Sequence, residues 1–393
     1  MTITRRSRRL RLMAAAAVIA AGGLAAAACS NTSSAGASGG NTSSGNTGSS
    51  ANAVSQVVNS AGTLAGRPSL SQFCGTKKIT VALADGFGGN SWRKIVHYLF
   101  DLDAKQCPNI TKVYYTNANG NPAQYASDIQ GLVAQGVNVI VTYDDFGPAG
   151  LPAIRAAHKA GVQIVPYISD PGGTPGTDYT TFVALNAAAT GQAWAKWLNE
   201  ALGGNGTTIM LGGTPGNGSS PGYLKGFQDS LASYPGLKLV STTPVTTNWT
   251  VAGEQQGMAG VLSHYPGIDS VMTDYLATYG AVLRAYQAAG KQPGPVAGFT
   301  SSNADGCLWQ QYHAQYPKWQ MFSVDGDPNG VSIALRKGVA AAEGKADPEP
   351  DTLTMTVSID TLHGKMPKCD PALPPDTDFS TPLTATQLHQ ALG

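Results

Sequence analysis

The sequence predicts an α/β protein with two doubly wound domains, each built on a parallel sheet. From residue 68 onward, short apolar segments with the pattern of a buried strand alternate with amphipathic segments of helical length. Strict alternation of this kind is typical of parallel sheets that are covered by helices on both faces. About 325 residues take part, which is enough for two domains of ordinary size.

A closed barrel of eight strands is the alternative architecture. Two open sheets fit better, because the predicted units outnumber those of a barrel and because residues 178–181 have the pattern of a crossover. The predicted limits are residues 68–185 and 326–352 for the N-terminal domain, and residues 186–325 and 353–393 for the C-terminal domain.

The first half contains the predicted strands 78–84, 112–116, 137–142 and 162–168. The predicted helices between them are 91–106, 122–135 and 148–160. Ser91 is the expected N-cap of the first helix, and Gly136 and Gly161 are expected to end the other two.

The pattern restarts in the second half. The predicted strands are 181–185, 207–211, 237–244, 270–273, 296–299 and 320–324. The predicted helices are 187–202, 219–234, 251–265, 277–289 and 329–343. The Gly-rich stretch 212–218 has no basic residue beside it, which favours a mobile loop over an anion site.

The N-terminus has the pattern of a secretory signal peptide over residues 1–28. Arginines precede an apolar stretch at 12–28, and small residues lead directly into Cys29. This order resembles a bacterial lipobox, in which the cysteine is lipidated, although Ala26 stands where Leu is usual. Ordinary cleavage at an Ala-x-Ala site is the alternative, and a transmembrane anchor fits less well because the apolar run is short. The export route, general or twin-arginine, stays open.

Residues 29–67 are rich in Ser, Gly, Asn and Thr, and we expect them to form a flexible tether. The prediction is therefore an exported protein that is lipid-anchored to the outer face of the cell membrane. Charged residues make up 12% of the chain and the net charge is +1, so no basic surface for a nucleic-acid partner is expected.

Four cysteines follow Cys29, which is typical of two disulfides in an exported chain. No CxxC motif or His cluster accompanies them, so no metal site is expected. Of the three possible pairings we favour Cys74 with Cys107 and Cys307 with Cys369. Cys74 precedes the first strand and Cys107 ends the first helix, and in a βαβ unit these two points lie at the same edge of the sheet.

Polar and aromatic side chains follow nearly every predicted strand. In open α/β sheets ligands bind at the carboxyl ends of the strands. Carboxylates and amides bind hydroxyl groups, and aromatic rings pack on the C–H face of a sugar ring. The predicted ligand-binding residues are Phe87, Asn90, Trp92, Asp144, Tyr167, Asp170, Asn186, Tyr223, Trp249, Asp274, Tyr275, Thr300 and Asp325.

Some of these residues have simpler interpretations. Asp144 or Asp145 could N-cap the helix that begins near Pro148, and Trp92 could be a core residue. The catalytic and nucleotide-binding motifs HExxH, GxxxxGK[ST] and GxGxxG are absent from the sequence, and we predict no enzyme and no cofactor. An acid/base pair such as Asp85 with Asp170 is the enzymatic alternative.

With these residues in place, the sequence resembles the type I periplasmic sugar-binding family, the ribose-binding protein branch of ABC importers. The resemblance covers residues 78–359. The motifs that carry it are Asn90–Ser91–Trp92, Gly226–Phe227, Gly280 to Lys291, Gly298–Phe299 and Asp327–Pro328. It implies two α/β domains joined by a hinge of several strands, with the ligand bound between them.

The resemblance also implies individual roles. Asn90 would bond a hydroxyl group, Trp92 would stack on the ring, and Trp249 would be the opposing aromatic from the second domain. Asn186 matches a hinge residue, and Tyr275 stands where the family has an Asn ligand.

Four positions depart from the family. An Asp-Arg pair after the fourth strand is replaced by Ser169–Asp170, an Arg by Tyr223, and an Asp by Thr300. The loss of Arg predicts a more acidic pocket, which leaves a sugar, a polyol or an amino sugar as the ligand. The predicted function is a monomeric solute-binding lipoprotein that delivers this ligand to an ABC permease. The alternative is a sensor that presents the closed form to a membrane receptor.

Overall fold

The computed structural model describes residues 68–353 and 355–393. The predicted signal peptide, Cys29 and the predicted tether lie outside the described residues. Among the described helices, none combines the length and the hydrophobicity that are needed to span a bilayer.

The first sheet contains six parallel strands in the order β12-β5-β4-β3-β1-β2. These strands are β1 (Ile79–Asp85), β2 (Ile110–Asn117), β3 (Val139–Tyr143), β4 (Gln163–Ile168), β5 (Val183–Leu185) and β12 (Thr352–Leu353). The central strands β1 and β3 are almost wholly buried, whereas the edge strand β2 is half exposed. This is the burial that a sheet covered on both faces requires.

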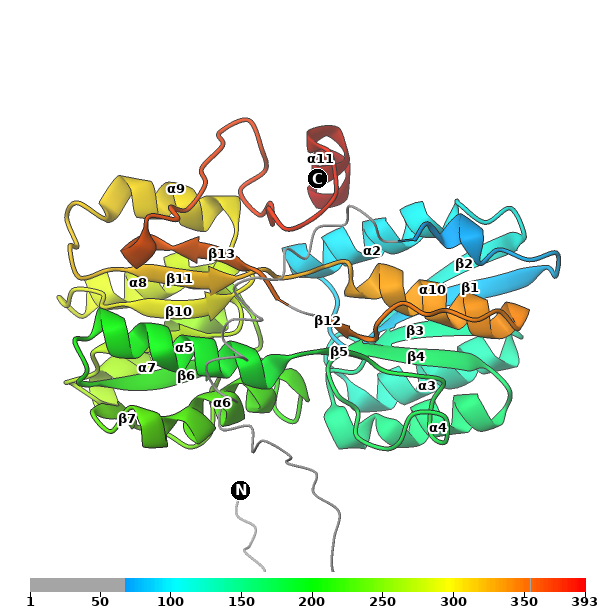
Figure 1. The fold of residues 1–393 in the computed structure, drawn as a ribbon, viewed down its shortest axis with the longest axis horizontal. Helices are drawn as coiled ribbons and strands as arrows, with labels where there is room; N and C mark the ends of the chain where they lie inside the picture. Colours follow the sequence, from blue (N-terminus) through cyan, green and yellow to red (C-terminus); the bar gives the residue numbers. More distant parts are fainter. Residues whose placement is uncertain (1–67, 354) are drawn as a thin grey trace, which may run out of the picture. The chain divides into compact units, whose positions relative to one another are not determined.

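Helices cover both faces of the first sheet (Figure 1). On one face, α2 (Ser91–Ala104) and α10 (Gly330–Glu343) pack together, with the short helix η1 (Leu70–Gln72) beside α10. On the other face lie α3 (Pro122–Ala134) and α4 (Leu151–Lys159), the latter preceded by η2 (Gly147–Ala149). The helices of the first face and those of the second belong to separate hydrophobic clusters.

The second sheet has the order β13-β11-β10-β9-β6-β7, with β8 paired to β6. Its strands are β6 (Gly206–Gly212), β7 (Leu237–Leu239), β8 (Val245–Thr246), β9 (Ser270–Thr273), β10 (Val296–Phe299), β11 (Met321–Val324) and β13 (Val357–Asp360). All pairs are parallel except β11 with β13.

The helices of the second domain also form two layers (Figure 1). In one layer α5 (Ala187–Ala201) packs on α6 (Ser219–Ser230), which runs into η3 (Leu231–Ser233). In the other layer α7 (Val251–His264) packs on α8 (Tyr279–Ala288), beside η4 (Leu276–Thr278) and α9 (Asn303–Tyr312). The structure therefore confirms the predicted fold of two open sheets with helices on both faces. The alternative of a closed barrel is wrong.

Several elements differ from the sequence prediction. The N-cap of α2 is Asn90, whose Oδ1 accepts the N–H of Arg93 at 2.9 Å, and not Ser91. Helix α9 was not predicted, because Trp309 is the only large apolar side chain among its buried residues and hydrophobic periodicity does not reveal it. Its start is fixed instead by a capping box between Ser302 and Asp305. Only the first three residues of the predicted strand 237–244 form a strand, β7, and the short strand β8 begins directly after the predicted range.

The two disulfides are those predicted, Cys74–Cys107 and Cys307–Cys369. The second disulfide joins α9 to a long C-terminal segment, residues 366–393. Asn303 bonds the backbone of this segment in both directions, donating to the carbonyl oxygen of Asp370 and accepting its N–H, each at 2.8 Å.

The C-terminal segment ends in α11 (Ala385–Leu392), which follows η5 (Thr361–His363) after a long loop. Helix α11 packs on α2 of the first domain (Figure 1), where the hydroxyl of Tyr98 donates to Gln390 Oε1 at 2.5 Å. Leu388 is buried. Residues 353–393 were predicted to belong to the second domain, but the end of this segment, α11, packs on the first.

We expect that removal of the Cys307–Cys369 disulfide by paired Ala substitutions lowers the free energy of unfolding by about 4 kcal/mol. The disulfide closes a loop of 62 residues, and cross-linking a loop of this length restricts the unfolded chain by about that much. Denaturant unfolding measures the change. The paired Cys74 and Cys107 substitutions, with a separation of 33 residues, serve as the comparison and should cost slightly less. An unchanged unfolding midpoint in both variants would contradict the expectation.

Candidate functional site

A cavity lies between the carboxyl ends of the two sheets, where the fold predicts a ligand. Both domains contribute to its wall. The lining residues are Asn90, Trp92, Arg93, Tyr143, Ile168, Ser219, Tyr223, Trp249, Asp274, Tyr275, Phe299 and Thr300.

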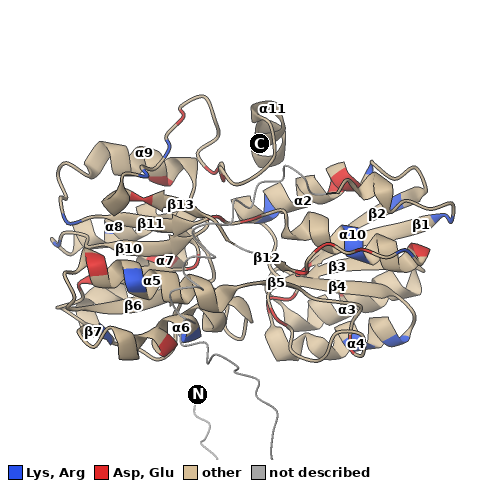
Figure 2. Cartoon of the chain, viewed as in Figure 1, with Lys and Arg blue, Asp and Glu red and all other residues tan. Residues whose placement is uncertain are grey.

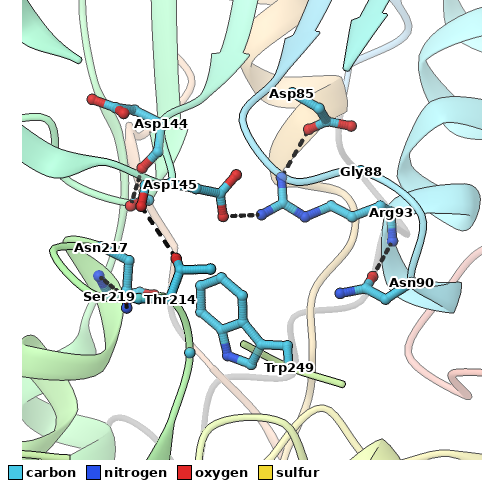
Figure 3. A network of polar contacts seen from close by, with 12 residues as sticks. Asp85, Gly88, Asn90, Arg93, Asp144, Asp145, Thr214, Asn217, Ser219 and Trp249 are labelled. Atoms are coloured by element: carbon cyan, nitrogen blue, oxygen red, sulfur yellow. Dashed lines mark hydrogen bonds and ion pairs between the residues drawn. The ribbon is translucent and has the colours of Figure 1, made fainter. Parts of the chain in front are cut away.

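Arg93 is the central charged residue of the cavity wall. It lies in the first turn of α2, is 2% exposed, and is held between two carboxylates that are wholly buried. Its Nη1 lies 2.8 Å from Asp85 Oδ1 at the end of β1, and its Nη2 lies 2.8 Å from Asp145 Oδ1 after β3 (Figure 3). The guanidinium also lies over the ring of Tyr143, 3.4 Å from the ring centroid. The cavity wall therefore contains a fixed cation that is packed against an aromatic ring.

The charges of this group depend on one another. Burial raises the pKa of Asp145 to about 7, against the lowering effect of Arg93. Burial also raises the pKa of Asp85. Burial works against the charge of Arg93, but the two carboxylates outweigh it and raise its pKa. The group is held together because each charge would be costly to bury alone.

Two tryptophans reach the cavity, one from each domain. The indole Nε1 of Trp92 donates to the carbonyl oxygen of Gly326 at 2.9 Å. The indole Nε1 of Trp249 donates to Asp274 Oδ1 at 2.9 Å, and its ring lies on the backbone of Gly213. A Cβ at Gly213 would lie 2.0 Å from that ring, so the position requires glycine. Hydrogen bonds at the indole nitrogens leave the apolar parts of both side chains available to a ligand.

Asp274 is buried behind Trp249 and both of its carboxylate oxygens are used. Oδ1 accepts the indole N–H, and Oδ2 accepts the hydroxyl of Ser220 at 2.5 Å. Burial raises the pKa of Asp274 to about 6, while the two hydrogen bonds lower it. Nearby, the hydroxyl of Tyr223 is buried without a hydrogen-bond partner. A buried polar group of this kind is satisfied when a ligand hydroxyl reaches it.

The backbone is strained around the cavity. Ile168, Trp249 and Thr300 line it with positive φ angles of 63°, 52° and 59°. Positive φ is rare for residues other than glycine and is a genuine outlier for β-branched ones. Such strain persists only where the surrounding structure imposes it, and it gathers at binding sites. The strained backbone positions therefore coincide with the cavity that the predicted side chains line.

Direct contacts between the domains close the cleft. The hydroxyls of Ser91 and Tyr275 lie 3.0 Å apart. Thr214 Oγ1 donates to the carbonyl oxygen of Asp145 at 3.2 Å, and the N–H of Gly218 donates to Ser169 Oγ at 3.1 Å. The Gly-rich stretch 212–218, which we expected to be a mobile loop, makes these last two contacts. A Cβ at Gly218 would lie 2.2 Å from the backbone oxygen of Asp170, so glycine permits the approach.

The structure brings seven of the predicted ligand-binding residues to the cavity. They are Asn90, Trp92, Tyr223, Trp249, Asp274, Tyr275 and Thr300. Trp92 is buried, which agrees with the simpler interpretation that it is a core residue. It also lines the cavity. The oxygen of Asn90 already caps α2, which leaves its amide nitrogen for a ligand.

The other six predicted residues do not line this cavity. Tyr167 lies in the core, with its ring centroid 5.3 Å from that of Tyr143. Asn186 N-caps α5, and Asp325 lines a separate cavity beside β13. Phe87 packs near Gly120 in the loop after β1, so that a Cβ at Gly120 would lie 3.1 Å from its ring.

Asp144 and Asp170 fold back onto their own loops. Asp144 Oδ1 accepts the N–H of Phe146 at 2.9 Å, and Asp170 Oδ1 accepts that of Gly172 at 2.7 Å. The alternative that Asp144 or Asp145 caps the helix near Pro148 is wrong, because neither η2, whose N-cap is Phe146, nor α4, whose N-cap is Gly150, has a side-chain cap.

Sequence reasoning missed five lining residues, Arg93, Tyr143, Ile168, Ser219 and Phe299. Arg93 matters most. The expectation of a more acidic pocket rested on the loss of Arg at two positions of the family, and Arg93 lies at a different position. The available signal was an Arg directly after Trp92 in the first turn of a helix whose neighbouring strand ends in Asp85.

The chain was compared with known proteins. A family model described as "Periplasmic binding protein domain" matches residues 81–345. The chain is 25% identical over 198 residues to the xylitol-binding protein of Mycolicibacterium smegmatis, covering 50% of this chain and 55% of that one. It is 24% identical over 198 residues to the D-xylose-binding periplasmic protein of Escherichia coli, covering 48% and 58%. The chain thus spans little more than half the length of the curated relatives it matches.

Solved structures show the same fold. The arabinose-binding component of an ABC transporter from Shewanella, bound to L-arabinofuranose, superposes with a TM-score of 0.61 at 21% identity, covering 71% of this chain and 91% of that one. The Caulobacter myo-inositol-binding protein has a TM-score of 0.61 at 21% identity, covering 72% and 94%. A solute-binding protein of an ABC transporter from Thermobispora bispora gives 0.62 at 24% identity, covering 80% and 94%. These likenesses establish the two-domain periplasmic binding protein fold.

We expect Arg93→Met to lower the free energy of unfolding by about 3–5 kcal/mol at pH 8, because it leaves two buried carboxylates without their partner. The loss should shrink at pH 5. Without Arg93 the pKa values of Asp85 and Asp145 rise further, so the folded state keeps these groups protonated while the unfolded chain ionises them as the pH rises.

Denaturant unfolding of the wild type and the variant at the two pH values measures this. Arg155→Met removes a half-exposed arginine paired with Asp178 and is the matched control, with a much smaller effect expected. Equal losses at pH 5 and pH 8 would show that the buried carboxylates do not carry the effect.

Proposed function

The chain belongs to the periplasmic binding protein family, a family of binding proteins and not of enzymes, and from this premise we propose that it is the extracytoplasmic solute-binding component of an ABC importer. Its ligand is a small neutral sugar or polyol, bound in the cavity between the two domains. The observation that carries the proposal is the cavity wall itself, in which a tryptophan from each domain accompanies buried hydrogen-bonding groups.

The charges favour a neutral ligand. Arg93, the cation in the cavity wall, is already paired with Asp85 and Asp145, so it does not offer an uncompensated charge to an anion. Asp274 uses both oxygens within the protein. What remains is hydrogen-bonding capacity, for which the hydroxyl of Tyr223 and the amide nitrogen of Asn90 are available, next to aromatic surface. Polyhydroxylated molecules match that combination.

The relatives agree in the chemistry of their ligands. Xylitol, D-xylose, L-arabinofuranose and myo-inositol, which are named for the relatives and solved structures above, are all neutral and polyhydroxylated. An amino sugar is a less suitable ligand than the sequence suggested, since the carboxylates at the cavity are paired with Arg93 or engaged by Trp249 and Ser220.

Ligand capture proceeds by closure of the two domains. One proposed rigid body consists of residues 68–185 and 326–352, and helix α11 moves with it. The other consists of residues 186–325 and the strand β13. Contacts such as Ser91 with Tyr275 form only in the closed state, so they contribute to the affinity by stabilising it. The closed form is the one that an ABC permease would distinguish from the open form.

We further propose that the protein is exported and anchored by a lipid on Cys29, followed by a flexible tether. The basic and apolar segments before Cys29 and the small polar residues after it support this. A tether would hold the folded domains close to the membrane in which the permease lies. Figure 2 shows Lys, Arg, Asp and Glu scattered over both domains and not gathered on one element, which fits a partner recognised by shape more than by charge.

Trp92→Ala and Trp249→Ala should each weaken ligand binding at least about tenfold, because each ring contributes burial and aromatic packing to the bound ligand. Titration calorimetry with xylitol, D-xylose, L-arabinose and myo-inositol measures this. Trp309→Ala, which removes a buried tryptophan outside the cavity, is the matched control and should leave the affinity unchanged. Folded Trp92 and Trp249 variants that retain full affinity would overturn the assignment of the site.

Cys29→Ser should abolish lipid attachment in the native host, so that the protein is either unprocessed or released into the medium. Mass spectrometry of the mature N-terminus and fractionation of the cells measure the change. The neighbouring substitution Ser30→Ala is the control and should stay membrane-bound. A wild-type protein that begins at another residue and carries no acyl chain would rule out the anchor.

A further inference from the structure

A second cavity lies beside β13, the edge strand of the second sheet (Figure 1). Its volume is about 210 Å³, which gives room for several water molecules or for one small organic molecule. Among the described residues, none lines both this cavity and the one between the domains. The second cavity is therefore a separate space in the molecule.

This cavity lies at the carboxyl ends of parallel strands. Ser301 and Asp325 line it shortly after β10 and β11, which are paired in parallel. Strand β13 forms a second side of the cavity, and the C-terminal segment forms a third side with Lys368 and Phe379. In open α/β sheets, this end of the strands is where ligands bind.

Three of the described residues that line the cavity are charged, and the positive ones do not contact the negative one. Asp325 contributes a carboxylate, and Lys365 and Lys368 contribute ammonium groups. In the part of the chain that the structure describes, no ion pair joins the carboxylate to either lysine. Nζ of Lys365 donates to the carbonyl oxygen of Val357, which leaves it two more hydrogens to donate. Nζ of Lys368 lies 5.7 Å from the ring centroid of Phe379.

The backbone that carries these charges is fixed on both sides of the cavity. The N–H of Asp325 donates to the carbonyl oxygen of Thr356 at 2.8 Å. Lys368 directly precedes Cys369, which the second disulfide joins to α9. A Cβ at Gly306 in α9 would collide with the carbonyl oxygen of Lys368, so glycine permits this close approach. Groups held on a fixed backbone are suited to bind a ligand in one orientation.

The surroundings of Asp325 favour a cation beside it. Burial is the main cause that raises the pKa of Asp325, to about 7. The negative charges of Asp378 and Asp327 act in the same direction, and the positive charge of Lys365 opposes them. Asp378 is 4% exposed, and its Oδ2 is buried without a hydrogen-bond partner among the described residues. A cation bound at this end of the cavity would be attracted by these carboxylates, whereas an anion would be repelled.

We propose that the second cavity binds a small zwitterion, namely an α-amino acid with an aliphatic side chain. Its ammonium group lies against Asp325, its carboxylate accepts hydrogen bonds from Lys368 and Lys365, and its side chain packs on Val357 and Phe379. A ligand with only one charge would leave either the carboxylate or the lysines without a partner, and a neutral sugar would leave both. This proposal does not rest on the proposed function, which concerns the other cavity.

Three molecules with one carbon skeleton test the proposal by titration calorimetry at pH 8, above the pKa of Asp325. L-Leucine carries both charges, 4-methylpentanoate lacks the ammonium group, and 3-methylbutylamine lacks the carboxylate. L-Leucine should bind at one site per chain, at least about tenfold more tightly than either analogue, because each analogue loses one set of charge-assisted hydrogen bonds. No binding of L-leucine or L-valine would overturn the proposal, as would equal affinities for L-leucine and either analogue.

Two variants assign the charges to their partners. Asp325→Asn should weaken the binding of L-leucine at least about tenfold without weakening that of 4-methylpentanoate, which has no ammonium group. Lys368→Met should weaken the binding of L-leucine to a similar extent without weakening that of 3-methylbutylamine. Lys238→Met changes an exposed lysine in β7, at the opposite edge of the sheet, and should bind as the wild type does. An equal loss for all three molecules in both variants would indicate a structural role and would overturn the proposal.

The same titration locates the site. Trp249→Ala alters the cavity between the domains and should leave the affinity for L-leucine unchanged. If Trp249→Ala abolishes the binding of L-leucine and Asp325→Asn does not, the amino acid binds between the domains and the proposal is wrong. If Asp325→Asn fails to fold, Lys368→Met, which changes an exposed side chain, still decides.

Discussion

The buried group of Arg93, Asp85 and Asp145 holds the site together, since it joins α2, which lines the cavity, to the ends of two strands of the first sheet. Asp85 ends β1, Asp145 follows β3, and Arg93 lies in the first turn of α2, so the two ion pairs fix the helix over the ends of neighbouring strands. The guanidinium in turn supports the ring of Tyr143, and the backbone of Asp145 accepts Thr214 from the second domain. Each charge is tolerable in the interior only because the others are present. The position of this part of the cavity wall, its lack of an uncompensated charge and one contact between the domains therefore all depend on these three residues.

The second domain holds its part of the site by a different means. Trp249 is not positioned by an ion pair such as those of Arg93. It is placed by a strained loop, by Gly213 beneath its ring, and by Asp274 at its indole nitrogen. Thr247 and Glu254 support the loop from behind. A wall held by ion pairs in the first domain therefore faces a wall held by hydrogen bonds in the second.

The chain passes between the two domains more often than a simple hinge requires. It crosses after β5, after β11 and after β12, and the C-terminal segment crosses again to place α11 on α2. The Cys307–Cys369 disulfide and Asn303 fix one end of this segment to α9, while Leu388 and Tyr98 fix the other. This segment is therefore attached to both domains. It also leaves a second cavity beneath it, lined in part by Asp325 and Lys368.

The sequence by itself determined the fold and the two disulfides, and it placed seven residues of the cavity. Strand and helix alternation is a local signal, and the carboxyl ends of parallel strands necessarily meet at one edge of a sheet. Trp92, Trp249 and Asp274 could be found in this way because they directly follow strands or begin helices. The tertiary structure alone decided which of the strand-end residues turn toward the cavity. Asp144 and Asp170 bond their own loops, whereas Arg93 enters the cavity from within a helix. It also decided where α11 lies and that Glu254 shares a hydroxyl with the Trp249 loop. The direction of a side chain and the partner of a buried charge depend on contacts between distant segments, and no pattern along the chain records those contacts.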